Sequence, residues 1–202
     1  LATLLKLPCY GHFRQADLSR GGQGAPLAPI VDHHYFSSYD CCINLGGIAN
    51  ISFPGQSKPA FDLCGFNQIL NHLASNFKDE MDRDGQYSKN GKLNSDLLKK
   101  LNAWSYIQKE PPKSLSNQEV QDFYLPLLQK HPSSPADQMK TFLEHVVQVI
   151  KQSENGVTSQ QTKILLTGGG SMNQTFVSML QQHLPKGNIK VIEEPWGSFK
   201  EA

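Results

Sequence analysis

Two glycine-rich turns are the segments of this sequence best suited to approach a phosphate. One reads Asn44-Leu45-Gly46-Gly47 and the other reads Thr167-Gly168-Gly169-Gly170, and each follows a short apolar run. Because glycine has no Cβ, the backbone N–H groups of such turns can come close to phosphate oxygens. Neither turn fits the P-loop or the G-x-G-x-x-G pattern. Each alone could be a tight structural turn, but the two together favour a nucleotide cleft.

Asp62 is the candidate general base. It lies in the run Phe61-Asp62-Leu63-Cys64-Gly65, at the expected end of a strand and just before an amphipathic helix. A carboxylate at the mouth of a sheet can accept a proton from an attacking nucleophile. It could equally be the negative partner of the helix dipole. The local sequence leaves both interpretations open.

Three other charged residues could contact an anionic or hydroxylated ligand. Arg14 and Asp17 lie beside a glycine-rich run at 21–26, and they could equally form a surface ion pair. Lys113 follows two prolines and could contact a phosphate, although an exposed, solvated lysine is the more ordinary outcome. The histidines and the four cysteines lack the spacing of metal ligands. We therefore predict no metal ion held by clustered side chains.

The strands that must position these residues are short. Apolar runs at 41–45, 48–53 and 60–63 are separated by Gly and Pro, which predicts a meander or a pair of hairpins. A further buried run at 163–167 feeds the second glycine turn, Asn173 opens a helix, and 189–192 is expected to be another strand. The last forty residues therefore look α/β.

Helical periodicity fills the middle of the chain. Apolar residues recur with helical spacing from 66 to 77, from 95 to 104, from 116 to 127 and from 136 to 153. Ser95 is the expected N-cap of the second helix, and Ser116 with Glu119 forms a capping box for the third. Pro126 is expected to bend or end that third helix. Residues 1–36 are expected to be loop-rich, and residues 79–91 are expected to be a loop.

Charge and hydropathy exclude some kinds of partner. The 202 residues carry 19 Lys and Arg against 18 Asp and Glu, a formal charge of +1, so there is no general attraction to nucleic acid or to an anionic membrane. No apolar run approaches the roughly 20 residues needed to cross a bilayer, and the first residues do not resemble a secretory signal. We expect a cytoplasmic protein.

The combined motifs resemble the anhydro-N-acetylmuramic acid kinase family, in the family's order and over essentially the whole chain. The resemblance implies an α/β fold, an actin/hexokinase-like ATPase (ribonuclease H-like) lobe with a mixed sheet and flanking helices, incomplete at both ends. The matching stretches are Phe13–Asp17, Gly21–Leu27, Asn44–Ser52, Phe61-Asp62 with Asn67, Asp84-Gly85, Gly91–Asn94, Pro111–Ser114 and Thr167–Gly170 with Asn173.

The resemblance also implies a function. Family members use ATP, with Mg²⁺, to open 1,6-anhydro-N-acetylmuramic acid with water and phosphorylate it to N-acetylmuramic acid 6-phosphate in cell-wall sugar recycling, and a homodimer is one assembly to consider. Asp62 matches the proposed base. The residues implied near the sugar are Arg14, Asp17, Gln23, Gly24 and Asn67, and those implied near the nucleotide are Asn44, Gly46, Gly47, Asn50, Gly168, Gly169, Gly170 and Asn173.

The chain also departs from the family pattern. The stretch Leu63-Cys64-Gly65-Phe66-Asn67 replaces a common T-G-P-G-N, and the Gly-Thr-Ser-rich phosphate loop with which the family begins has no counterpart here. We therefore expect one partial kinase region, mostly the second lobe. Its parts would be a loop and β-rich sugar and phosphate segment at 1–66, a helical segment at 67–158 and an α/β nucleotide segment at 159–202. The alternative is a non-catalytic sugar- or nucleotide-binding remnant of the family.

Overall fold

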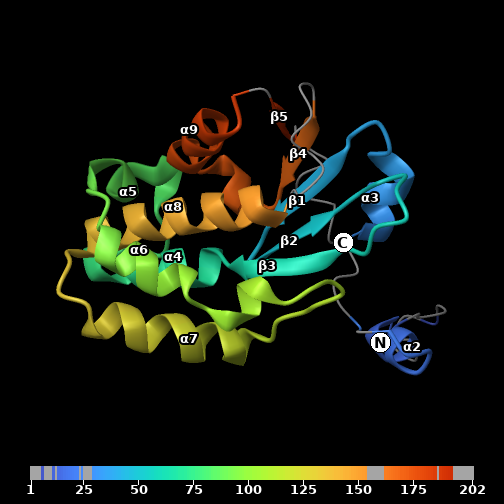
Figure 1. Cartoon of the computed structure of the whole chain (residues 1–202), viewed down its shortest axis with the longest axis horizontal. Coiled ribbons are helices and arrows are strands. Elements are labelled where there is room, and N and C mark those ends of the chain that lie inside the picture. The colour runs from blue at the N-terminus through green and yellow to red at the C-terminus, as the bar shows by residue number, and fades with distance from the viewer. Residues whose placement is uncertain are drawn as a thin grey trace.

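The computed structural model describes residues 6, 11, 13–22, 24, 29–153, 162–185 and 187–192. These residues form a mixed five-stranded sheet in the order β3-β2-β1-β4-β5, drawn on the right of Figure 1. The strands β1 to β3 are antiparallel, whereas β1, β4 and β5 run parallel. The bounds are Cys41–Leu45 for β1, Ile48–Ser52 for β2, Phe61–Gly65 for β3, Lys163–Thr167 for β4 and Asn188–Val191 for β5.

The predicted meander is confirmed by β1, β2 and β3, which follow one another in sequence and pair in the same order. The strand β4 then pairs with β1 on its other side, although the helical part of the chain separates the two. All five residues of β1 are buried, because this strand lies inside the sheet and both of its faces are covered. The glycine turns that follow β1 and β4 therefore come to the same edge of the sheet.

The helices α4 to α9 gather beside the sheet, and α8 runs through the middle of that layer (Figure 1). It contacts α4, α5, α6, α9 and β3. The bounds are Phe13–Leu18 for α2, Pro29–Tyr35 for α3, Asn67–Ala74 for α4, Gln86–Asn90 for α5, Ser95–Asn102 for α6, Asn117–Lys130 for α7, Pro135–Ser153 for α8 and Gln174–His183 for α9, with short 3₁₀ turns at Ser75–Phe77, Arg83–Gly85, Ser105–Gln108 and Gly169–Met172.

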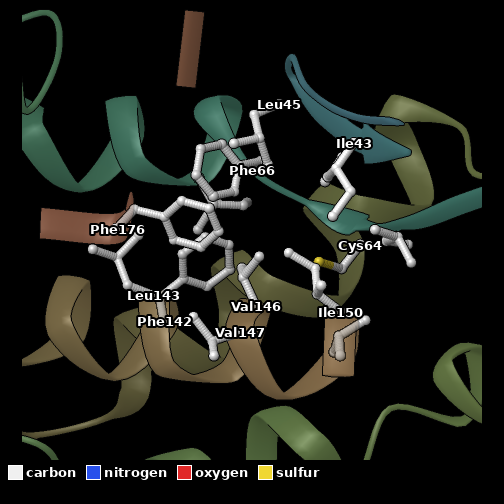
Figure 2. Close-up of a cluster of buried hydrophobic side chains, with 14 of the residues drawn as sticks. Ile43, Leu45, Cys64, Phe66, Phe142, Leu143, Val146, Val147, Ile150 and Phe176 are labelled. Atoms are coloured by element: carbon white, nitrogen blue, oxygen red, sulfur yellow. The ribbon is translucent and has the colours of Figure 1, made fainter. Parts of the chain in front are cut away.

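The core lies between α8 and the sheet. Figure 2 shows the α8 side chains meeting apolar side chains from β1, β3 and α9. The rings of Phe66 and Phe176 pack edge to face with centroids 4.9 Å apart, a favourable aromatic geometry. The labelled residues are all fully buried: Ile43, Leu45, Cys64, Phe66, Phe142, Leu143, Val146, Val147, Ile150 and Phe176.

The segment at 79–91, predicted to be a loop, holds a 3₁₀ turn and α5, so that prediction is wrong. The segment at 1–36, predicted to be loop-rich, holds α2 and α3 among its described residues. The helix α5 begins where the Asp82 carboxylate accepts hydrogen bonds from the backbone N–H groups of Tyr87 and Ser88, at 2.8 and 3.2 Å. Because these helices are short and lack an apolar stripe, hydrophobic periodicity does not detect them.

Two details of the longer helices also differ from expectation. The N-cap of α6 is Asn94, whose side chain accepts from the Leu97 N–H at 3.0 Å, rather than Ser95. Pro126 does not end α7, which continues to Lys130. Pro126 lies on the exposed side of that helix, where water can bond the carbonyl that the proline leaves without a partner. The capping box at the start of α7 is confirmed.

Candidate active site

A row of polar side chains crosses one face of the sheet. Thr167, Asn44, Asn50 and Asp62 are successive cross-strand partners on β4, β1, β2 and β3, and side chains of opposed residues share a face. The Thr167 hydroxyl donates to Asn44 Oδ1 at 3.3 Å. The neighbours of Asn44 on β1 point into the core (Figure 2), so this polar row lies on the opposite face.

A bulge in β3 brings Asp62 into the polar row. On β2, Ala49 pairs with Cys64 and Asn50 pairs with Asp62, so Leu63 is the extra residue. In a regular strand, Asp62 and Cys64 would face the same side. Here Cys64 packs in the core (Figure 2), while Asp62 faces the polar row. Bulges commonly redirect a side chain beside an active site.

The environment of Asp62 suits a proton acceptor. Its Oδ2 accepts from the Leu115 N–H at 2.9 Å, and the Tyr106 hydroxyl donates to its carbonyl at 2.8 Å. Desolvation raises the pKa of Asp62, opposed by the Leu115 hydrogen bond and the charge of Arg14. A carboxyl with a raised pKa can exchange a proton closer to neutral pH.

The first glycine turn provides hydrogen-bond acceptors for the free backbone N–H groups at the start of α4. The N–H groups of Phe66 and Asn67 donate to the carbonyls of Gly47 and Gly46, at 2.8 and 3.0 Å. Asp62 directs its carboxylate to Leu115 instead, which disfavours its interpretation as the partner of this helix dipole. A Cβ placed on Gly47 would meet no atom within 4 Å, so this turn is anchored on its carbonyl side and open above Gly47.

The three glycines of the second turn have different environments. Gly168 has φ +78°, and a Cβ on it would lie 2.6 Å from Asn44 Oδ1. A Cβ on Gly170 would lie 2.3 Å from the Phe66 ring. A Cβ on Gly169 would meet only the Asn67 amide nitrogen, at 3.8 Å. Packing therefore requires glycine at 168 and 170, whereas Gly169 faces open space.

The space beside Gly169 is a pocket of about 140 Å³ that brings together residues predicted for two ligands. Asn67, implied for the sugar, lines it together with Gly169, Gly170 and Asn173, implied for the nucleotide. Asn173 also caps α9 by accepting from the Phe176 N–H at 2.9 Å. The other lining residues, which the sequence did not single out as site residues, are Leu70, Asn71, Met81, Asp82, Arg83, Asp84 and Met172.

Three of the residues implied near the sugar, Arg14, Asp17 and Gly24, lie on α2 or just after it. Asp17 Oδ2 accepts from the Gly24 N–H at 2.7 Å, and a Cβ on Gly22 would overlap that carboxylate. Asp17 thus ties the glycine run back to α2. Arg14 is exposed, and its charge acts on Asp62. Gln23 lies outside the described residues.

Lys113 is buried, so the expectation of a solvated lysine is wrong. Its side chain is 8% exposed, and its ammonium donates to the Ile107 carbonyl at 3.0 Å and lies 5.0 Å from the centre of the Tyr106 ring. Desolvation lowers the pKa of Lys113. A larger cavity of about 560 Å³ borders Lys113 but touches none of the predicted site residues.

In the described part of the chain, no group of three or more His, Cys, Asp or Glu side chains is placed to hold a metal ion. No helix in these ranges combines the length and the apolar character needed to cross a membrane.

Comparison with known proteins identifies related sequences. A model of the family described as anhydro-N-acetylmuramic acid kinase matches residues 1–195. The kinase of that name from Salinibacter ruber is 36% identical over 198 residues, which cover 90% of this chain and 50% of that protein. The one from Aliivibrio fischeri is 32% identical over 190 residues, covering 90% and 52%. The chain thus spans about half the length of the curated relatives it matches.

Solved structures share the fold. Component A of the (R)-2-hydroxyglutaryl-CoA dehydratase of Acidaminococcus fermentans aligns with a TM-score of 0.50 and 15% identity, covering 86% of this chain and 61% of that one. The activator of the 2-hydroxyisocaproyl-CoA dehydratase from Clostridium difficile, solved with bound ADPNP, gives 0.50 and 14%, covering 78% and 55%. Such identities show the fold alone, and they confirm the predicted actin/hexokinase-like fold with its mixed sheet and flanking helices.

Proposed function

The chain belongs to the anhydro-N-acetylmuramic acid kinase family, and we propose that it forms one wall of the active site of an ATP-dependent sugar kinase. The reaction would convert 1,6-anhydro-N-acetylmuramic acid, ATP and water into N-acetylmuramic acid 6-phosphate and ADP. One observation carries this proposal. The bulge at Leu63 turns Asp62, a carboxyl with a raised pKa, onto the same face of the sheet as Asn44 and Thr167. These two residues lie at the ends of β1 and β4, where the glycine turns begin.

Asp62 would be the general base. As water attacks the anomeric carbon of the sugar, Asp62 would take the proton from that water and the bond from this carbon to O6 would break. The released O6 would then receive the γ-phosphoryl group of ATP. Because Leu115 holds Oδ2, the proton would go to Oδ1. Burial favours the protonated carboxyl, so it assists this transfer.

ATP would lie along the end of the sheet where β1 and β4 lead into the two glycine turns. Its nucleoside would enter the pocket beside Gly169, and its phosphates would extend toward the open side of Gly47. Phosphoryl transfer depends mainly on positioning and on neutralising charge. Mg²⁺ would supply part of that neutralisation. The amide oxygens of the polar row, on Asn44 and Asn50, are of the kind that Mg²⁺ accepts beside phosphates.

The sugar would bind where α2 and its glycine run approach Asp62. The electrostatic effect of Arg14 on Asp62 supports this placement, and Asp17, Gln23 and Gly24 belong to the same segment. Hydroxyl groups of a sugar suit carboxylate, amide and backbone partners of this type. A homodimer and a cytoplasmic location stay predictions.

The test is a product assay with the variant Asp62→Asn. The chain would be incubated with ATP, Mg²⁺ and 1,6-anhydro-N-acetylmuramic acid, and the sugar 6-phosphate would be detected by mass spectrometry. The variant should form no product yet bind ATP as the wild type does, and Asp122→Asn, at an exposed position, is the matched control. Undiminished turnover in Asp62→Asn would rule out this base. Ligand binding without turnover in the wild type would mean that these 202 residues alone do not catalyse the reaction.

A further inference from the structure

Two of the four methionines line the pocket beside Gly169 and are exposed there. Met81 is 42% exposed and Met172 is 51% exposed, whereas Met139 and Met179 are buried in the core. Large apolar side chains are usually buried, and an exposed pair at a concave site points to a binding function. The other exposed large apolar side chains of the described residues do not line this pocket: Leu18, Ile30, Tyr35 and Leu93.

The backbones that carry the two methionines are fixed. Met172 directly precedes Asn173, the N-cap of α9. Met81 directly precedes Asp82, whose carboxylate binds the start of α5. The turn that follows is held against α9, because the Thr175 hydroxyl donates to the Gly85 carbonyl at 3.0 Å. The two thioethers are therefore presented from a pre-formed site.

Three polar side chains of the pocket are already engaged within the protein. Asp82 accepts from α5, Asn173 Oδ1 accepts from Phe176, and the Asn67 amide donates to the Leu45 carbonyl at 3.0 Å. A ligand entering here therefore meets apolar surface from the two methionines and backbone at Gly169, with the exposed polar side chains of Asn71, Arg83 and Asp84 around them. Thioether sulfur makes favourable contacts with aromatic rings.

The size of the pocket limits what it can hold. Its volume of about 140 Å³ is below the roughly 300–1,000 Å³ of a site for a whole small molecule. It therefore suits one ring system, with the rest of the ligand extending over the glycine turns. We propose that Met81 and Met172 bind the planar base of the nucleotide through their thioether groups. This inference rests on the proposed function and adds the side chains that recognise the base.

The test is NMR of the 202-residue chain carrying ¹³C-methyl methionine, whose four methyl signals are assigned by single Met→Leu substitutions. Adenosine and ATP should both shift the Met81 and Met172 signals upfield, because a methyl group over a ring face is shielded. Inorganic tripolyphosphate should leave them unmoved. Met139 and Met179, in the core, are the internal controls.

The outcomes distinguish a failure of the proposed methionine site from a failure of the proposed kinase function. If ATP shifts the amide signals of the glycine turns but leaves Met81 and Met172 unmoved, the methionine site is wrong while the nucleotide cleft stands. If ATP shifts neither set of signals, both proposals are overturned. Met81→Ala and Met172→Ala should each weaken ATP binding several-fold, whereas Leu93→Ala, exposed outside the pocket, should not. Unchanged binding in both methionine variants would also contradict the inference.

Discussion

The carboxylate of Asp62 accepts a hydrogen bond of 2.9 Å from the backbone N–H of Leu115, a residue 53 positions further along the chain. The backbone N–H of Asp62 in turn donates a hydrogen bond of 3.2 Å to the carbonyl of Lys113, in the same loop. Asp62 is therefore held between the bulge on one side of β3 and this loop on the other. An acid fixed from both sides is pre-organised for reaction, and its burial has a cost in stability.

Asp62→Asn should stabilise the fold at neutral pH. Burial raises the pKa of Asp62, so the folded state holds this proton more tightly than the unfolded state does. The contribution to stability is fully present below the ordinary aspartate range, near about 3.9, and is lost as pH rises through the folded-state pKa. The neutral amide avoids that loss, so its melting temperature should exceed that of the wild type near neutral pH.

The measurement is thermal unfolding at about pH 7 and about pH 3, where the advantage of Asp62→Asn should disappear. Asp122→Asn should show no such difference. A variant less stable than the wild type at neutral pH would mean that the hydrogen bond from Leu115 outweighs desolvation. Gain of stability with loss of turnover is the signature of an active-site residue.

The parts of the fold that depend on local sequence could be predicted. The runs at 41–45 and 163–167 are apolar and bounded by turn residues, so the strands there were predictable, and the apolar stripe of α8 is long enough to be unambiguous. The short helices α2, α3 and α5 have no such stripe. Their existence depends on individual hydrogen bonds, such as those of Asp82, which periodicity does not report.

The arrangement of the site could be predicted only in part. Family motifs single out Asp62 and the glycines, but the bulge at Leu63 depends on pairing with β2, and the bond from Leu115 joins distant positions. The placement of Asn67 beside Gly169 likewise depends on how α4 meets the sheet. The ligand roles of these residues remain predictions.

Gly170→Ala should reduce the stability of the fold, whereas Gly169→Ala should reduce the affinity for ATP. A methyl group at 170 would overlap the Phe66 ring, whereas one at 169 has room. Overpacking of a buried site typically costs about 1–3 kcal/mol, so Gly170→Ala should unfold at lower urea concentration. Gly169→Ala should keep its stability but bind ATP more weakly, because its methyl group intrudes on the pocket. Equal stability of the two variants would contradict this division between packing and binding.

Lys113→Met should leave ATP binding unchanged. The ammonium of Lys113 is engaged with the Ile107 carbonyl and lies over the Tyr106 ring, so a role with phosphate is not expected. Relief of desolvation and loss of that hydrogen bond should nearly cancel, which leaves stability within about 1 kcal/mol of the wild type. Calorimetric titration with ATP is the measurement, with exposed Lys99→Met as the control. A tenfold loss of affinity would return Lys113 to the phosphate site.

A buried hydrogen-bond chain links α7, α8 and α6. Asn102 donates its amide to Gln148 Oε1 at 2.8 Å, so its Oδ1 accepts from His145 Nδ1 at 2.7 Å. The Nδ1 atom must then carry the proton, and Nε2 of the neutral ring accepts from the Tyr124 hydroxyl at 2.8 Å. Desolvation lowers the pKa of His145 to about 3.

His145→Gln should reduce the sensitivity of the fold to acid. Because the folded pKa of His145 lies below its unfolded value of about 6.5, its contribution to stability is present above that value and declines as pH falls toward about 3. From about pH 6.5 to about pH 5 the decline should be on the order of 1.5 kcal/mol. Urea unfolding of His145→Gln should show a lower stability at neutral pH, since the glutamine satisfies Tyr124 and Asn102 less well, but a smaller loss on acidification. The control variant, His34→Gln at an exposed position, should lose as much stability on acidification as the wild type does. If His145→Gln loses as much stability as the wild type on acidification, His145 is not the neutral, buried group that this hydrogen-bond chain requires.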